Sequence, residues 1–218
     1  MPRFFNRKPK TENRFNMASV VGHALGAVII WEAGKRLPGG WVPPGPAWYL
    51  LPLMVAVLPD LDIFAHKITA AGPAMAHRGP THSLLAVLVI AGAAALAAYL
   101  IDSSVKLPRV FIVLFGCALM HPLLDFLMAC GPPVPFLWPW NSQGWLSPVQ
   151  LIPTAYYSRS VRGLLSLLRY PETWIGIGLE ALSLGSLWAA LLIWNRVGSA
   201  IFLALSGTGF YLTWKIFR

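Results

Sequence analysis

Histidine and aspartate residues recur at short spacings beside apolar segments of this 218-residue chain, which contains only five histidines. One group is the stretch HRGPTHS (77–83), which directly precedes a long apolar run. The other groups are Asp60 and Asp62 in LPDLD, and His121 and Asp125 in MHPLLD. Imidazole and carboxylate side chains are ligands of zinc, manganese and iron in proteins. These residue types therefore indicate a divalent metal site.

The composition is that of a membrane protein. Hydrophobic residues make up 56% of the chain and charged residues only 11%, whereas about 25% of the residues of a soluble domain are charged. The net charge of +9 does not indicate nucleic-acid binding, because the basic residues are spread over termini and loops instead of clustering on one surface. We therefore expect membrane lipid as a partner and no nucleic acid, and the oligomeric state stays open.

Apolar segments separated by proline- and glycine-rich breaks predict an all-α fold, a polytopic helical membrane protein with about six membrane helices. Four segments are long enough to cross a bilayer, namely 83–101, 109–130, 174–195 and 198–216. Two more are shorter, namely 17–33 and 46–59. If the N-terminus is cytoplasmic, most of the 17 lysine and arginine residues lie on the cytoplasmic side, as the positive-inside rule requires.

The same topology brings the chemical groups together. All five histidines, together with Asp60, Asp62 and Asp125, fall on the cytoplasmic side of the predicted helices. The predicted orientation rests on lysine and arginine residues and not on these histidines and aspartates. Their convergence on one membrane face therefore supports both the topology and a shared site at that face.

The two aspartate-containing pairs each have a structural alternative. His121 and Asp125 are four residues apart and share one helix face, where a polar pair can simply link two helices. Ionisable groups inside membrane spans are, however, usually functional. Asp60 and Asp62 can equally well end a helix at the membrane interface.

The stretch 77–83 and the tryptophan-rich stretch 132–148 also have two interpretations each. Pro80 suits the first turn of a helix, whose free N–H groups, with Arg78 beside them, can hold an anion such as phosphate. The alternative is helix capping with an interfacial anchor. The stretch 132–148 is either an ordinary interfacial belt or a lid over a lipid-like substrate on the same face.

Taken in order, GHALGA, LPDLD, AHRGPTHSLL and HPLLDFLMACGPPVPFLWPW resemble the YdjM-like family of bacterial inner-membrane proteins, which are described as metal-dependent hydrolases and as LexA-binding. The resemblance covers about residues 19–140. The family pattern falls on His23, Asp60, Asp62, His77, Arg78, Thr81, His82, Ser83, His121 and Asp125. The family has histidine directly after the second aspartate, where this chain has Ile63, and His66 follows three positions later.

The metal-ligand candidates are His23, Asp60, Asp62, His77, His82, His121 and Asp125. Seven candidates exceed the four ligands of a typical zinc ion, so either two metal ions bind or some residues only orient the others. Zinc is the expected metal, with manganese, iron and magnesium as alternatives. Whether His66 joins the ligands is open.

The expected function is that of a membrane-bound metal-dependent hydrolase, which cleaves an ester or phosphoester of a lipid-like substrate at the cytoplasmic face with metal-activated water. Asp60, Asp62 and Asp125 are the catalytic carboxylates, Arg78 holds a phosphate or developing oxyanion, and Thr81 and Ser83 bind substrate. The alternatives are an ion- or proton-coupled transporter or channel, and a non-catalytic scaffold with a structural metal.

The family resemblance also implies a multi-pass protein of the bacterial inner membrane. We divide the chain into four parts: a basic cytoplasmic tail (1–16), a metal-dependent hydrolase-like membrane core (17–140), an interfacial loop (141–172) and a C-terminal transmembrane helix pair (173–218).

Overall fold

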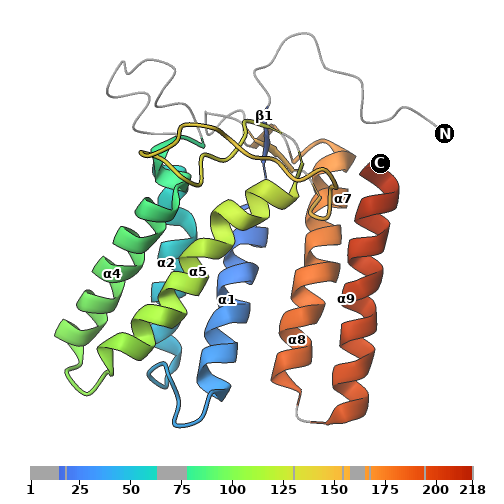
Figure 1. Cartoon of the computed structure of the whole chain (residues 1–218). Helices are drawn as coiled ribbons and strands as arrows, with labels where there is room; N and C mark the ends of the chain where they lie inside the picture. Colours follow the sequence, from blue (N-terminus) through green and yellow to red (C-terminus); the bar gives the residue numbers. More distant parts are fainter. Residues whose placement is uncertain are drawn as a thin grey trace.

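The computed structural model describes residues 15–17, 19–62, 78–129, 131–153, 155–157, 165–166, 168–193 and 195–217. These residues form a bundle of helices that run alternately up and down (Figure 1). The α-helices are α1 (Val20–Arg36), α2 (Leu50–Val57), α4 (Leu84–Ile101), α5 (Leu107–Leu127), α7 (Pro171–Glu180), α8 (Ser186–Leu192) and α9 (Arg196–Phe217). The prediction of an all-α polytopic membrane protein is confirmed.

Four helices in the described part of the chain are long and apolar enough to cross a membrane, namely Leu84–Ile101, Leu107–Leu127, Pro171–Leu192 and Arg196–Ile216. They correspond to the four long segments that hydropathy predicts. The third span joins α7 and α8 through η5, a π-helical turn over Ala181–Gly185. The shorter apolar helix Pro46–Leu61 and the 17-residue α1 correspond to the two shorter predicted segments.

The first helix begins three residues later than expected. Phe15–Met17 form the short strand β1, which pairs antiparallel with β2 (Ala155–Tyr157). Helix α1 then starts after Ser19, whose hydroxyl accepts a hydrogen bond from the N–H of Gly22. A serine at the N-cap satisfies a backbone donor that the helix itself cannot, so the local chemistry of Ser19 decides where the helix begins.

The second segment is only partly α-helical, because prolines interrupt it. The 3₁₀ turn η1 (Pro46–Tyr49) precedes α2, and the 3₁₀ turn η2 (Leu58–Leu61) follows it. Proline lacks the backbone N–H that a regular helix interior requires. Asp60 lies on η2 and Asp62 directly after it, so the turn presents both carboxylates at the end of this short helix.

Small side chains allow the helices of the core to approach closely. Ala91, Ala95 and Ala98 of α4 are at most 1% exposed and belong to one buried cluster with Val110 and Leu114 of α5. The outward sides remain apolar, since Leu100 and Ile101 are 74% and 73% exposed. Exposed apolar surface of this kind is compatible with lipid and not with water.

Chain direction places the predicted site residues at one end of the bundle. Helix α1 starts at this end, α5 finishes there, and α4 starts there (Figure 1). We call it the site end. The loop 131–153 covers the same end, where the N–H of Leu84 at the start of α4 donates to the carbonyl of Phe136 over 2.9 Å. The C-terminal end of α9 also lies at the site end.

Candidate metal centre

Five predicted ligands meet at the site end, and each comes from a different stretch of chain or a different helix turn. His23 lies in the first turn of α1, Asp60 on η2, and His82 on η4 (Pro80–His82), just before α4. His121 and Asp125 lie one helix turn apart on the last two turns of α5. All five residues are buried. We call them the metal cluster.

The closest pair in the metal cluster is His82 and His121, whose Nε2 atoms lie 3.0 Å apart. The other ring nitrogen of His121, Nδ1, donates to the carbonyl of Ala56 over 2.6 Å. This bond holds the proton on Nδ1 and leaves the Nε2 lone pair of His121 directed at His82. A backbone carbonyl that orients an imidazole in this way is typical of metal-binding histidines.

Two carboxylates approach the same pair of nitrogens. Asp60 Oδ1 lies 3.3 Å from His121 Nε2 and 3.7 Å from His82 Nε2. Asp125 Oδ2 lies 3.4 Å from His82 Nε2 and 3.8 Å from His121 Nε2. Asp125 Oδ2 is buried and makes no hydrogen bond within the described structure. Oxygen and nitrogen lone pairs therefore converge on one small region.

His23 extends the metal cluster on the other side of His121. The two imidazole rings stack with centroids 3.8 Å apart, and His23 Nε2 lies 3.7 Å from Asp125 Oδ1. Among the described residues, neither ring nitrogen of His23 has a hydrogen-bond partner, although the side chain is only 1% exposed. A buried polar atom without a partner is costly, and a bound cation would remove that cost.

These residues fit a divalent metal ion. One ligand atom from each residue lies within 4.8 Å of the others in two groups, His23–Asp60–His121 and His82–His121–Asp125. Two ligands of one tetrahedral zinc ion are about 3.3 Å apart, given zinc–nitrogen distances of about 2.0–2.1 Å. The observed separations of 3.0–3.8 Å between the nitrogen and carboxylate atoms of His82, His121 and Asp125 bracket that value.

Asp62 contacts the metal cluster from behind His82. Its Oδ2 lies 3.5 Å from Nδ1 of His82, on the ring edge opposite to His121. The hydroxyl of Thr81 donates to the same oxygen over 2.9 Å and lies 3.0 Å from His82 Nδ1. Asp62 and Thr81 therefore contact the imidazole of His82 on its Nδ1 side, and the ligand role of Asp62 and the substrate role of Thr81 stay predictions.

Arg78 is buried, at 3% exposure, and its side chain faces the protein. One guanidinium nitrogen donates to Asp125 Oδ1 over 3.0 Å, and another donates to the carbonyl of Pro132 over 3.0 Å. Its backbone has φ of 64°, a left-handed conformation that non-glycine residues rarely adopt. The backbone N–H donates to Asp62 Oδ2 over 3.2 Å, so contacts from both sides hold this conformation. The role in anion binding stays a prediction.

Ser83 acts as the N-cap of α4. Its hydroxyl donates to the carbonyl of Pro80 over 2.7 Å and accepts from the N–H of Ala86 over 3.2 Å. Helix α4 thus starts after the 3₁₀ turn instead of at Pro80, because Ser83 satisfies one of the free backbone donors. The structure supports the capping interpretation of this stretch, and substrate binding by Ser83 stays a prediction.

Charge around His82 favours a protonated imidazole while no metal is bound. Complete burial disfavours the charged form, but the nearby negative carboxylates of Asp125 and Asp60 outweigh it and raise the pKa of His82 to about 9. A metal ion bound at Nε2 must therefore displace a proton.

Two predicted candidates, His66 and His77, lie outside the described residues. Sequence reasoning also missed a buried carboxylate that holds the start of α1: Glu180 on α7 is completely buried and accepts hydrogen bonds from the backbone N–H and the hydroxyl of Ser19. The only sequence signal was one carboxylate inside a long apolar segment, where ionisable groups are rare.

Comparison with known proteins identifies the family of this chain. The sequence model of the family described as YdjM inner membrane protein matches residues 17–216. The chain is also similar to the inner membrane protein YbcI of Escherichia coli (strain K12), with 31% identity over 148 residues, or 66% of this chain and 80% of the relative. No solved structure matches the chain.

Proposed function

The chain belongs to the family of YdjM inner membrane proteins, and we propose that it is a metal-dependent hydrolase of a lipid-like ester or phosphoester. The observation that carries the proposal is the buried pair of imidazoles, His82 and His121, whose Nε2 atoms face each other at 3.0 Å between two carboxylates. The bond from His121 to the carbonyl of Ala56 prepares this arrangement before any ligand arrives.

His82, His121 and Asp125 would hold the metal ion, with zinc as the first candidate because nitrogen and oxygen ligands in this number suit it. When bound, a divalent ion activates water as a nucleophile at neutral pH and polarises the oxygen of the scissile group. Arg78 would hold Asp125 directed toward the two imidazoles, and Asp62 would orient the imidazole of His82 through its contact with Nδ1.

Asp60 is the group that would meet the substrate. Its side chain is 10% exposed, whereas those of His23, His82, His121 and Asp125 are at most 1% exposed. Asp60 therefore marks the direction from which a substrate reaches the metal cluster. A carboxylate on that open side can accept the proton of the attacking water, and we assign this role to Asp60.

Position at one end of a bundle of membrane helices favours an amphiphilic substrate. A site between apolar helices and the membrane surface can receive a polar headgroup while hydrocarbon chains stay in the bilayer. We place the site on the cytoplasmic side, since most lysine and arginine residues follow the positive-inside rule in that orientation.

Metal analysis tests the proposal. The full chain is purified without added metal, and its metal content is compared with that of His82→Ala and Asp125→Ala. Asp102→Asn is the matched control, because Asp102 follows the last residue of α4, at the opposite end from the metal cluster, and in the described structure its side chain accepts hydrogen bonds only from Ser104. We expect about one ion per chain in the wild type and the control, and a loss in both cluster variants. Equal metal content in all four proteins would overturn the proposal.

Hydrolysis is tested on a panel of phospholipids with and without a chelator. Release of product that stops on chelation and returns with added zinc would support the proposed metal-dependent hydrolase activity. Because most of the metal cluster is almost fully buried, a non-catalytic protein with a structural metal is the second candidate. Stable metal binding without hydrolysis of any lipid would favour that candidate, and ion transport by sealed proteoliposomes without hydrolysis would favour a transporter.

A further inference from the structure

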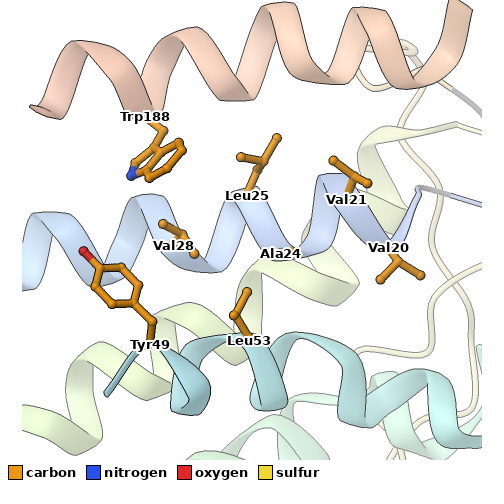
Figure 2. Close-up of a pocket in the computed structure, with 8 residues that line it drawn as sticks. All are labelled: Val20, Val21, Ala24, Leu25, Val28, Tyr49, Leu53 and Trp188. Carbon is orange, nitrogen blue, oxygen red and sulfur yellow. The ribbon is translucent and has the colours of Figure 1, made fainter. Parts of the chain in front are cut away.

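An apolar groove with a volume of about 380 Å³ runs along α1, between α2 and α8 (Figure 2). One wall is formed by α1 itself, with Val20, Val21, Ala24, Leu25 and Val28. Leu53 of α2 and Trp188 of α8 form the other walls. None of the lining side chains is charged. Such a groove is unsuited to ordered water molecules, because a bound water needs several polar partners.

The groove is bounded by apolar helices of the bundle. Its walls belong to α1, to the short apolar helix and to the span Pro171–Leu192. Val20 and Val21 are 55% and 43% exposed, so the groove is open near the site end. At the opposite end it meets Tyr49, whose hydroxyl accepts a hydrogen bond from Lys35 Nζ. A hydrocarbon chain can therefore enter at the site end and stop at a polar group.

The same two segments border both the groove and the metal cluster. On α1, Ala24 lines the groove and the adjacent His23 belongs to the metal cluster. The segment that carries Leu53 in the groove continues into η2, which carries Asp60. Val20 and His23 are three residues apart, about 4.5 Å along the helix axis. Along α1, the open end of the groove and His23 of the metal cluster are therefore less than one helix turn apart.

We propose that this groove holds one hydrocarbon chain of the lipid substrate while the ester or phosphoester lies beside Asp60. The inference rests on the proposed function and specifies its substrate class as a lipid with a chain long enough to reach past Val28. From Val20 to Val28 the helix rises about 12 Å. Substrates with short chains leave this surface exposed, so they lose the free energy of burying hydrocarbon along it.

Photolabelling with a lipid tests the groove directly. The full chain is reconstituted into vesicles of phosphatidylglycerol that contain an analogue with a diazirine on one acyl chain, and labelled peptides are mapped by mass spectrometry. Ala24→Phe fills the groove. Ala93→Phe is the matched control, because Ala93 is an exposed alanine on α4 that does not line the groove.

We expect label on the Val20–Val28 peptide of the wild type and of Ala93→Phe. Ala24→Phe should lower this label by roughly tenfold, since the phenyl ring excludes several methylene groups from the groove. Equal labelling of that peptide in Ala24→Phe, or label spread evenly over the lipid-facing sides of α4 and α9, would overturn the inference.

A chelator separates this inference from the proposed function. Labelling of the groove does not need the metal, so chelated protein should give the same map as untreated protein. Groove labelling in a protein that binds no metal would overturn the proposed function and leave a lipid-chain site. If Ala24→Phe leaves metal-dependent hydrolysis unchanged for lipids with short and with long chains, the proposed role of the groove is overturned, and the proposed function is not.

Discussion

The Nε2 atoms of His82 and His121 lie 3.0 Å apart although the two residues are 39 positions apart in the chain. The proton on Nδ1 of His121 is engaged by the carbonyl of Ala56, so only His82 can supply a proton between the two Nε2 atoms. In the metal-free protein Nε2 of His82 therefore carries a proton, and a bound metal ion would take the place of that proton.

Metal affinity is expected to rise with pH up to about pH 9. The pKa of His82 is raised to about 9 in the metal-free protein, so metal binding at pH 7 releases its proton, and apparent affinity improves by about tenfold per pH unit below 9. Calorimetric titrations in two buffers of different ionisation enthalpy measure this release. Binding that releases no proton at pH 7 and is independent of pH between 7 and 9 would contradict the prediction.

The raised pKa of His82 also makes the stability of the metal-free protein depend on pH. This stability should fall as the pH rises, whereas the metal affinity should increase. A raised pKa in the folded state contributes stability that is fully present below about pH 6.5 and is lost as the pH rises toward 9. Thermal unfolding of the chelated protein should therefore occur at lower temperature at pH 9 than at pH 6.5. Saturation with metal should remove or reverse this trend.

Replacement of Arg78 by alanine should destabilise the metal-free protein by about 3 kcal/mol, because Asp125 then remains buried without its guanidinium partner. Unfolding in detergent measures the effect, and Arg109→Ala is the control, because the side chain of Arg109 makes a long, exposed hydrogen bond of 3.5 Å to the carbonyl of Gly39. The loss should be smaller with bound metal, which also compensates the carboxylate. A loss equal to that of Arg109→Ala would show that the pair contributes nothing.

Gly22 and Glu180 should behave as a coupled pair. A Cβ at Gly22 would lie 2.7 Å from Glu180 Oε1, so Gly22→Ala must displace the carboxylate that accepts from Ser19. Glu180→Ala alone removes the acceptor of two part-buried hydrogen bonds from Ser19 to a carboxylate, at a cost of about 1–3 kcal/mol. In the Glu180→Ala background, Gly22→Ala should cost at least about 1 kcal/mol less than in the wild type. Strictly additive effects in unfolding experiments would refute the coupling.

The C-terminus should be cytoplasmic, together with the metal cluster. Helix α9 ends at the site end (Figure 1), so a reporter fused after the last residue reports the side of the metal cluster. We expect a fused green fluorescent protein to be fluorescent and a fused alkaline phosphatase to be inactive. The reverse pattern would show that the metal cluster lies at the outer face of the membrane, with the same geometry.

Hydropathy alone determined the spans. Long apolar segments must form helices in a bilayer, because every backbone polar group has to be paired within the segment. The even alternation of these spans was enough to bring His23, Asp60, His82 and the pair on α5 to one end. Helix ends were less certain, since local caps at Ser19 and Ser83 decide where α1 and α4 begin.

Tertiary packing decided which side chains of the site contact one another. Spacing alone could not separate Asp60, which faces the two Nε2 atoms, from Asp62, which lies behind His82, because both follow the same short helix. It also could not indicate that Arg78 contacts Asp125, or that Glu180 holds the start of α1. These contacts join segments that are far apart in the chain, and only the packing of the helices determines which side chains meet.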